Sequence, residues 1–311
     1  MLTGKNKSSK REFSCCLLRS YPLKSRLIAY GLFIFTSFFL FMNRSEGKET
    51  ATPKYSPIVI IKQGRLVGID KSDLTEYLGV RYALPPVGAL RWKPPAPVLP
   101  STNSIIATQY GSHCPQTPSP WGPPSNSEDC LFLNIYVPKH VQNQNIKPFP
   151  VMVWIHGGSF TAGAGSLYDP RKIVTQGKVI VVTINYRLGI LGFFAHPALD
   201  HEGHDSGNYG IMDQQLALRW VKDNIAAFGG DSNNVTIFGE SAGGASIYAN
   251  LVSPLATGLF QKAIIQSGVL EDISLKDAET RGITYAKHMG CSSGLAKQIA
   301  ACLRSIPIST L

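Results

Sequence analysis

The chain has 311 residues, of which 44% are apolar and only 16% are charged, so its composition is that of a globular protein with a sizeable core. Its net charge of +10 is uneven: residues 1–44 contain eight Lys or Arg and one Glu, a balance of +7, and residues 45–311 balance to +3. The nearly neutral body has no basic stripe with interleaved aromatic residues, which excludes a nucleic-acid-binding domain, and its lack of internal repeats excludes a solenoid.

An uncharged stretch, residues 27–42, follows a basic leader of residues 1–26 and ends at Asn43 and Arg44. We interpret residues 27–42 as an uncleaved transmembrane signal anchor, with the leader in the cytoplasm and the following domain outside the cytoplasm. The alternatives are a cleaved signal, which would make the protein secreted, and a buried core helix. Residues 43–57 are polar and contain prolines, which indicates a linker to a domain that covers residues 58–311.

The six cysteines agree with an exported domain. Cys15 and Cys16 lie in the leader, where we interpret them as free thiols, with palmitoylation as the alternative. The other four form two pairs that are close in sequence, and each pair would close a loop short enough for a disulfide worth about 3 kcal/mol. No CxxC or Cys/His spacing is present, so we expect no metal site. These four residues are Cys114, Cys130, Cys291 and Cys302.

Short β-branched runs broken by glycine predict small antiparallel strands between residues 58 and 83, and another strand is predicted at 132–138. A helix is predicted at residues 214–228, because Leu216, Trp220 and Ile225 share one face and Gly229 follows. Nearly continuous apolar runs are typical of parallel strands that are buried on both faces. The alternation of such strands with helices predicts an α/β fold. Four such runs occur, at 151–155, 179–186, 235–238 and 263–266.

The segment Gly239-Glu240-Ser241-Ala242-Gly243 matches the pattern G-x-S-x-G. The pattern alone is weak evidence, since it arises often by chance. Here it follows an apolar strand directly and precedes a run of small residues with helical character, which is the strand–turn–helix arrangement of a nucleophile elbow. Such a turn presents its serine at the N-terminus of a helix, where developing negative charge is stabilised. The sequence therefore predicts Ser241 as a nucleophile.

A second Gly-rich segment, residues 156–160, also follows a predicted strand directly. Acyl transfer requires N–H donors at the position where the tetrahedral oxyanion forms, and a Gly-rich turn allows the backbone to approach that position. By itself the segment could be a simple turn after a strand. Its occurrence before the elbow, in the order that the fold requires, favours an oxyanion hole.

Together these motifs resemble the type-B carboxylesterase/cholinesterase family, and the resemblance extends from about residue 58 to residue 304. Besides the elbow, four segments carry it: SEDCLFLNIYVP (127–138), NYRLG (185–189), GNYGIMDQ (207–214) and NIAAFGGD (224–231). The resemblance implies an α/β-hydrolase fold with a mostly parallel central sheet. It also implies hydrolysis of carboxylic esters through an acyl-Ser241 intermediate, with no metal or cofactor.

The resemblance assigns further roles by position. Gly158, Ser159 and Ala242 would offer the oxyanion N–H groups, although the family usually has a third glycine where this chain has Ser159. The implied disulfides are Cys114–Cys130 and Cys291–Cys302, and the implied buried ion pairs are Arg91–Glu128 and Arg187–Asp213.

The chain departs from the family after the nucleophile. The family's catalytic acid and base would both lie beyond residue 311, and the 70 residues after Ser241 contain one histidine, His288. We interpret His288 as a surface helix residue and His156 as structural, not as bases. We therefore expect this C-terminally truncated chain to be inactive or nearly so. We also expect a sheet edge and an apolar face to be left uncovered.

Two functions from different classes remain. The favoured one is a serine carboxylesterase for small-molecule esters, and the alternative is a membrane-anchored binding or adhesion module of the same fold. General carboxylesterase is favoured over cholinesterase because the first disulfide loop is short and Pro-rich, although it contains Trp121. Glu240 either tunes the electrostatics of the site or is buried and held by hydrogen bonds. The sequence specifies neither the ester nor the oligomeric state.

Overall fold

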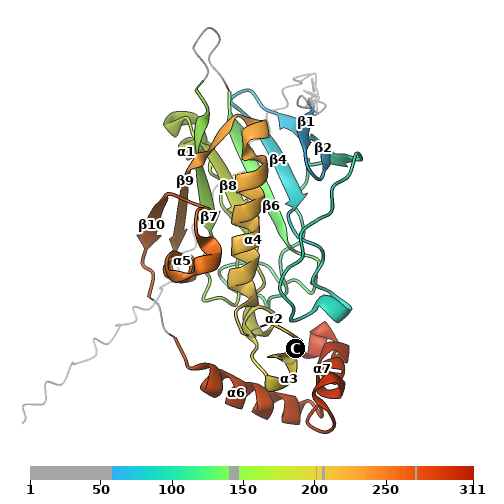
Figure 1. Cartoon of the computed structure of the whole chain (residues 1–311). Coiled ribbons are helices and arrows are strands. Elements are labelled where there is room, and N and C mark those ends of the chain that lie inside the picture. Colours follow the sequence, from blue (N-terminus) through green and yellow to red (C-terminus); the bar gives the residue numbers. More distant parts are fainter. Residues whose placement is uncertain (1–57, 140–146, 201, 205–206, 270–271) are drawn as a thin grey trace, which may run out of the picture. The chain divides into compact units, whose positions relative to one another are not determined.

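The computed structural model describes residues 58–139, 147–200, 202–204, 207–269 and 272–311 (Figure 1). Residues 1–57, which contain the predicted leader, anchor and linker, lie outside these ranges. Among the described residues, no helix has the length and apolar character needed to cross a membrane.

A seven-stranded sheet forms the centre of the domain (Figure 1). Its order is β10 (Lys262–Gln266), β9 (Gly230–Glu240), β7 (Phe149–Ile155), β8 (Ile180–Ile184), β6 (Phe132–Pro138), β4 (Leu74–Arg81) and β3 (Ile69–Asp70). The first four strands pair in parallel, and each overlaps one of the four apolar runs that predicted a parallel sheet. β6, β4 and β3 continue the sheet with antiparallel pairing, so the sheet is mixed.

A second, three-stranded sheet contains β1 (Val59–Ile61), β2 (Gly64–Val67) and β5 (Ser104–Ile106). β1 and β2 pair antiparallel, as predicted for this region, whereas β5 joins β2 in parallel.

Helices cover both faces of the large sheet. Alternate residues of β7 point to opposite sides: Val151, Val153 and Ile155 belong to one core cluster, and Met152 and Trp154 contact another. The first cluster includes residues of α4 (Tyr209–Asn224) and α5 (Ala242–Val252), and the second includes a residue of α1 (Arg171–Gly177). This arrangement buries the central strands on both sides, which is the reason for their continuous apolar sequences.

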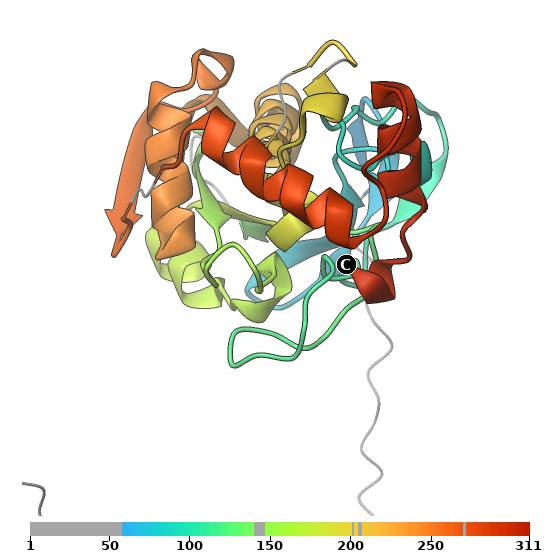
Figure 2. The ribbon, with the colours of Figure 1, turned by 90° about the horizontal axis from the view of Figure 1, so that it is seen from below.

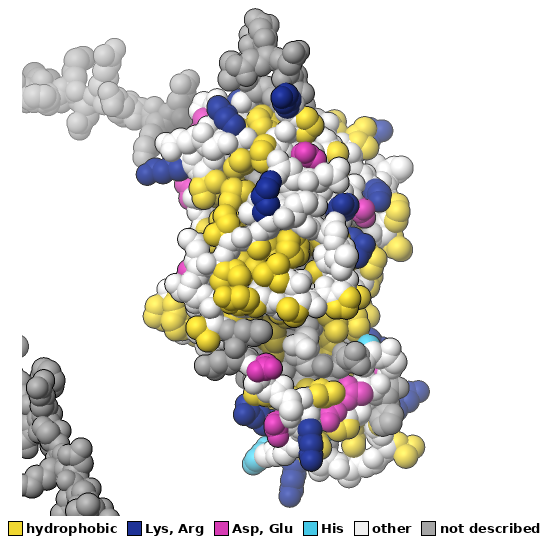
Figure 3. Space-filling view, turned by 60° about the vertical axis from the view of Figure 1, so that its left-hand side comes forward, with side chains coloured by type: hydrophobic (Ala, Val, Ile, Leu, Met, Phe, Trp, Pro, Cys, Tyr) yellow, Lys and Arg dark blue, Asp and Glu magenta, His cyan; other side chains and the backbone are white. Residues whose placement is uncertain are grey.

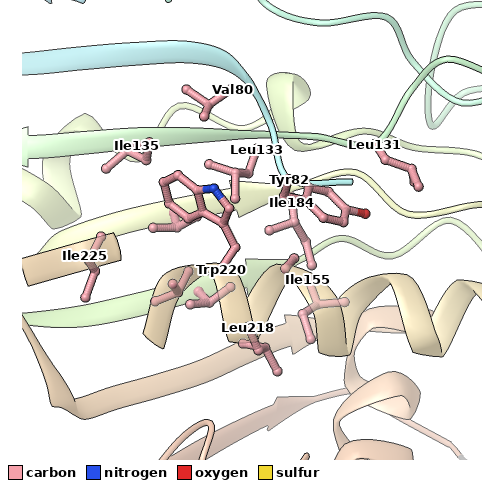
Figure 4. Packing of buried hydrophobic residues seen from close by; sticks show 14 of the residues in the cluster. Val80, Tyr82, Leu131, Leu133, Ile135, Ile155, Ile184, Leu218, Trp220 and Ile225 are labelled. Atoms are coloured by element: carbon pink, nitrogen blue, oxygen red, sulfur yellow. The ribbon is translucent and has the colours of Figure 1, made fainter. Parts of the chain in front are cut away.

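The predicted helix at 214–228 is α4 followed by a 3-10 turn, η3 (Ile225–Phe228). Trp220 and Ile225 are buried (Figure 4). Leu216 packs against the same cluster. Gly229 ends the segment with φ 79°, a left-handed conformation that glycine adopts without strain. The sequence prediction is therefore confirmed, with a helix that begins five residues earlier than expected.

A further layer of helices lies below the large sheet in Figure 1 and nearest the viewer in Figure 2. α2 (Gly189–Phe193), α3 (Pro197–Asp200), α6 (Leu275–His288) and α7 (Ala296–Ser305) share a core cluster with the buried Trp92. Arg91 donates to the Ile306 carbonyl at 2.6 Å, and Arg304 donates to the Arg91 carbonyl at 2.8 Å, which fastens the end of α7 to this layer. The remaining 3-10 turns are η1 (Gly88–Leu90), η2 (Gly165–Leu167), η4 (Pro254–Ala256) and η5 (Ile308–Thr310).

The covalent and ionic pairs implied by the resemblance are present in the structure. Disulfides join Cys114 to Cys130 and Cys291 to Cys302. The Arg187 guanidinium contacts both carboxylate oxygens of Asp213, at 2.8 and 2.7 Å, with both side chains buried. Arg91 forms the same kind of two-point contact with Glu128.

Candidate active site

Ser241 lies in the turn between β9 and α5, at the carboxyl end of the parallel strands. Its φ and ψ are 55° and −121°, a combination that non-glycine residues rarely adopt and that costs about 1–3 kcal/mol. Two backbone hydrogen bonds hold it there: the Ser241 N–H donates to the Gln266 carbonyl, and the Ser241 carbonyl accepts from the Ala245 N–H, both at 2.9 Å. The side chain is half-buried. The structure thus has the strained strand–turn–helix geometry that the sequence predicts.

The glycines of the elbow are required by close approach of the backbone. A Cβ at Gly239 would lie 2.7 Å from the Ile155 carbonyl oxygen, and a Cβ at Gly243 would overlap the same atom. At Gly244 it would meet the Gln266 carbonyl oxygen at 2.8 Å. The elbow is therefore pressed against the ends of β7 and β10, with no space for side chains on its inner side.

The Gly-rich turn after β7 lies directly beside the elbow. A Cβ at Gly157 would be 2.7 Å from the Glu240 carbonyl oxygen and 3.2 Å from the Ser241 Cβ. The next two residues have left-handed conformations, with φ 101° at Gly158 and φ 54° at Ser159. Ser159 therefore adopts a backbone conformation that normally favours glycine, at a cost of about 1–2 kcal/mol.

The three predicted oxyanion donors lie on these two segments. Ala242 is the first residue of α5, where a backbone N–H has no partner within the helix. The Gly158 carbonyl accepts from Thr161 N–H at 2.9 Å and Ala162 N–H at 3.0 Å, which folds the turn back on itself and orients the following Ser159 N–H. The arrangement can offer N–H groups from two directions to an oxygen bound near Ser241.

His156 is fully buried at the start of the turn. Its Nδ1 lies 2.8 Å from the Gly157 carbonyl oxygen, and its ring stacks on Tyr186 with 4.4 Å between centroids. Burial lowers its pKa to about 4, so the imidazole is neutral at pH 7. These contacts agree with the structural role expected for His156. The sequence reasoning did not single out Tyr186, although NYRLG was one of the segments behind the resemblance.

Glu240 has an exposed side chain, so the interpretation as a buried, hydrogen-bonded carboxylate does not apply in this structure. Its charge reaches Tyr168: burial raises the pKa of that phenol, and Glu240 raises it further. An electrostatic effect of Glu240 on the site stays a prediction.

The described residues do not bring a base to the nucleophile. The Ser241 hydroxyl forms no hydrogen bond to another described side chain. His288 is exposed in the last turn of α6, where its Nδ1 contacts the Thr284 carbonyl, as expected of a surface helix residue. The site in the described part of the chain thus places the predicted nucleophile beside the predicted oxyanion donors, without a general base.

Two cavities adjoin the turn at Phe160, the residue after Ser159. One, of about 520 Å³, lies between α2 and α6, and the other, of about 370 Å³, extends to Ala245 and Ala249 of α5. Their walls are mostly apolar, with Phe193 and Ile273 shared between them. An apolar group bound near Ser241 would find apolar surface on this side.

Comparison with known proteins gives consistent matches. The model of the "Carboxylesterase family" matches residues 55–311. The para-nitrobenzyl esterase of Bacillus subtilis (strain 168) is 46% identical over 244 residues, which cover 76% of this chain and 49% of that protein. Carboxylesterase 1E of Mus musculus is 42% identical over 273 residues, covering 81% and 48%.

Solved structures agree with these matches. A structure titled "Thermophylic PNB esterase" superposes with a TM-score of 0.72 at 42% identity, over 80% of this chain and 51% of that chain. A PNB esterase structure superposes with a TM-score of 0.71 at 44% identity. The chain thus spans about half the length of the relatives it matches, and the shared fold is the α/β-hydrolase fold expected from the sequence.

Proposed function

The chain belongs to the carboxylesterase family, and from this premise we propose that the protein containing it hydrolyses carboxylic esters through an acyl intermediate on Ser241. The observation that carries the proposal is the strained elbow at Ser241, with the Gly-rich turn of residues 157–159 beside it. The substrate class is a small-molecule ester, and the apolar cavities at Phe160 would receive its hydrophobic part.

In the proposed reaction, Ser241 Oγ attacks the ester carbonyl while a base removes the hydroxyl proton. The carbonyl oxygen becomes an oxyanion that accepts hydrogen bonds from the N–H groups of Gly158, Ser159 and Ala242. Collapse of this intermediate breaks the bond to the alcohol, which leaves with the proton held by the base. Water then attacks the acyl-serine, and the acid is released as Ser241 regains its proton.

The general base is the element that the described residues lack. We propose that the base and its orienting carboxylate come from outside these residues, and that the 311-residue chain alone is inactive or nearly so. An active preparation of the chain alone, whose activity is lost on Ser241→Ala, would contradict this second statement while supporting the first.

Fluorophosphonate labelling of an extract from the native source tests the function. We expect a labelled species that contains this sequence, and we expect Ser241→Ala to abolish the labelling. An intact mass well above 33.8 kDa would show that further chain completes the site. An unlabelled species at that mass, with a protein ligand found in a cell-surface binding screen, would instead support the binding-module alternative.

We also propose that residues 27–42 anchor the protein in a membrane, with the domain outside the cytoplasm. The two disulfides support an oxidising compartment. Protease treatment of sealed vesicles that carry the protein on their lumenal side should leave the domain protected. A mature N-terminus located after residue 42 would contradict the anchor and indicate secretion.

A further inference from the structure

The three oxyanion donors differ in how the structure orients them. Each N–H belongs to a planar peptide unit whose carbonyl oxygen comes from the preceding residue and points the opposite way. Holding the carbonyl therefore aims the N–H. The Ser241 carbonyl, which aims the Ala242 N–H, is held by the Ala245 N–H of the same helix at 2.9 Å.

The Ser159 N–H is aimed in a similar way by the main chain. Its partner in the peptide unit is the Gly158 carbonyl, which accepts from Thr161 N–H, from Ala162 N–H and from Thr161 Oγ1 at 3.3 Å. These donors belong to the turn itself, so the conformation of residues 158–162 maintains them without a distant side chain.

The Gly158 N–H is different, because its peptide unit is held by a side chain. The Gly157 carbonyl lies 2.8 Å from His156 Nδ1, and among the described residues no backbone donor reaches that oxygen. A carbonyl oxygen only accepts hydrogen bonds, so Nδ1 must carry the proton. His156 Nε2 is buried without a partner in the described part of the chain.

The histidine is itself fixed in place. Tyr186 stacks on the imidazole with an angle of 20° between the ring planes, and the Tyr186 hydroxyl donates to the His156 carbonyl at 2.8 Å. A Cβ at Gly163 would overlap His156 Nδ1 and lie 2.9 Å from His156 Cε1, so the backbone of Gly163 packs closely against this edge of the ring. The imidazole is thus buried and packed against Tyr186 and Gly163, and its one hydrogen bond to the described residues is directed at the turn.

We infer that His156 is a positioning residue for the proposed ester hydrolysis: its Nδ1–H holds the Gly157 carbonyl so that the Gly158 N–H points at the oxyanion. This inference rests on the proposed function. It assigns His156 no proton transfer and no contact with substrate. It also gives Tyr186 a defined task, which is to hold the imidazole in the orientation that the turn requires.

Two substitutions separate hydrogen bonding from packing. His156→Asn retains an N–H donor at the same number of bonds from the backbone but loses the aromatic ring. His156→Phe retains a ring that can stack on Tyr186 but has no donor. If the donor matters, kcat of the active esterase that contains this chain should fall about 10- to 100-fold in His156→Phe, approaching the loss seen when one oxyanion donor is removed, with KM within about threefold. His156→Asn should stay within about fivefold of the unsubstituted protein.

A packing role predicts the reverse order, and that result would overturn the inference. The pH dependence of kcat in His156→Asn should keep both of its limbs, because His156 is not the base. Loss of one limb would also overturn the inference.

Crystal structures of both variants give an answer that does not depend on activity. We expect the peptide between Gly157 and Gly158 to rotate in His156→Phe and to keep its orientation in His156→Asn. An unrotated peptide in His156→Phe would overturn the inference even if the esterase function holds. A protein without ester hydrolysis but with the rotated peptide would refute the proposed function while supporting the role of His156.

Discussion

The elbow region and the outer face of β10 and α5 lie next to each other, but the first is tightly packed and the second is exposed. Around Ser241, backbone atoms of β7, the Gly-rich turn and the elbow approach one another closely. A side chain in place of Gly239 or Gly243 would collide with them. On the outer face, apolar side chains are exposed to solvent in the described part of the chain (Figure 3). They include Tyr248, Leu251, Val252, Leu255 and Ile264, with Val252 79% exposed.

This contrast shows that the strained elbow and the uncovered apolar face, both predicted from the sequence, have separate causes. The strained backbone geometry of Ser241, the predicted nucleophile, arises from contacts within the described residues. The outer face belongs to the edge strand β10 and to the helix after the nucleophile, and no described residue covers it. The sheet edge and apolar face expected from the sequence are therefore present, and the elbow remains formed beside them.

The largest effect is expected from Gly243→Ala, which breaks the first region. The new Cβ would overlap the Ile155 carbonyl oxygen, a backbone atom that cannot move away at small cost. We expect a loss of roughly 3 kcal/mol or more in the free energy of unfolding, measured by urea denaturation, together with loss of fluorophosphonate labelling. Gly177→Ala is the matched control, because a Cβ there meets only the Val179 side chain at 3.6 Å or beyond. Equal stability of the two variants would contradict the prediction.

The second effect concerns acid sensitivity of the same region. Burial lowers the pKa of His156 to about 4, whereas a histidine in the unfolded chain titrates near 6.5. Between these values the unfolded chain binds a proton that the folded chain does not. Stability should therefore be greatest above pH 6.5 and fall as the pH drops towards 4, by about 3 kcal/mol from this group. The difference between the urea midpoints at pH 7 and pH 4 should be smaller in His156→Asn than in the unsubstituted protein. An equal difference in the two proteins would refute this account.

The smallest effect on stability, and the one that sharpens the contrast, is expected from Val252→Lys on the outer face. Val252 ends α5 and is 79% exposed, so the free energy of unfolding should change by less than about 0.5 kcal/mol. Self-association of residues 58–311, produced without the proposed membrane anchor and measured by light scattering against concentration, should decrease. Leu99→Lys adds the same charge at a residue that is 72% exposed and lies outside β10 and α5, and it should leave self-association unchanged. Equal effects of the two substitutions would show that net charge, not the outer face, governs association.

The sequence predicted the parallel strands and the helix after them well, because strands buried on both faces require continuous apolar runs. It did not predict that β4 and β6 extend the same sheet. Their pairing depends on which strand lies beside β8, and the order of apolar and polar residues within each strand does not specify its neighbour. The carboxylate of Glu240 was equally ambiguous, since its exposure depends on what packs over the elbow.

By itself, the sequence determined the α/β class, the position of Ser241 in a strand–turn–helix motif and the Gly-rich turn before it. These features are local: glycine positions, apolar runs and their order along the chain express them directly. Only the tertiary structure decided that the Gly157 carbonyl meets His156 Nδ1, that Tyr186 holds this ring, and that Ser159 adopts the left-handed conformation of a glycine. The physical reason is that the close approach of β7, β8 and β9 fixes the orientation of each peptide unit at their carboxyl ends, and this approach exists only once the sheet is assembled.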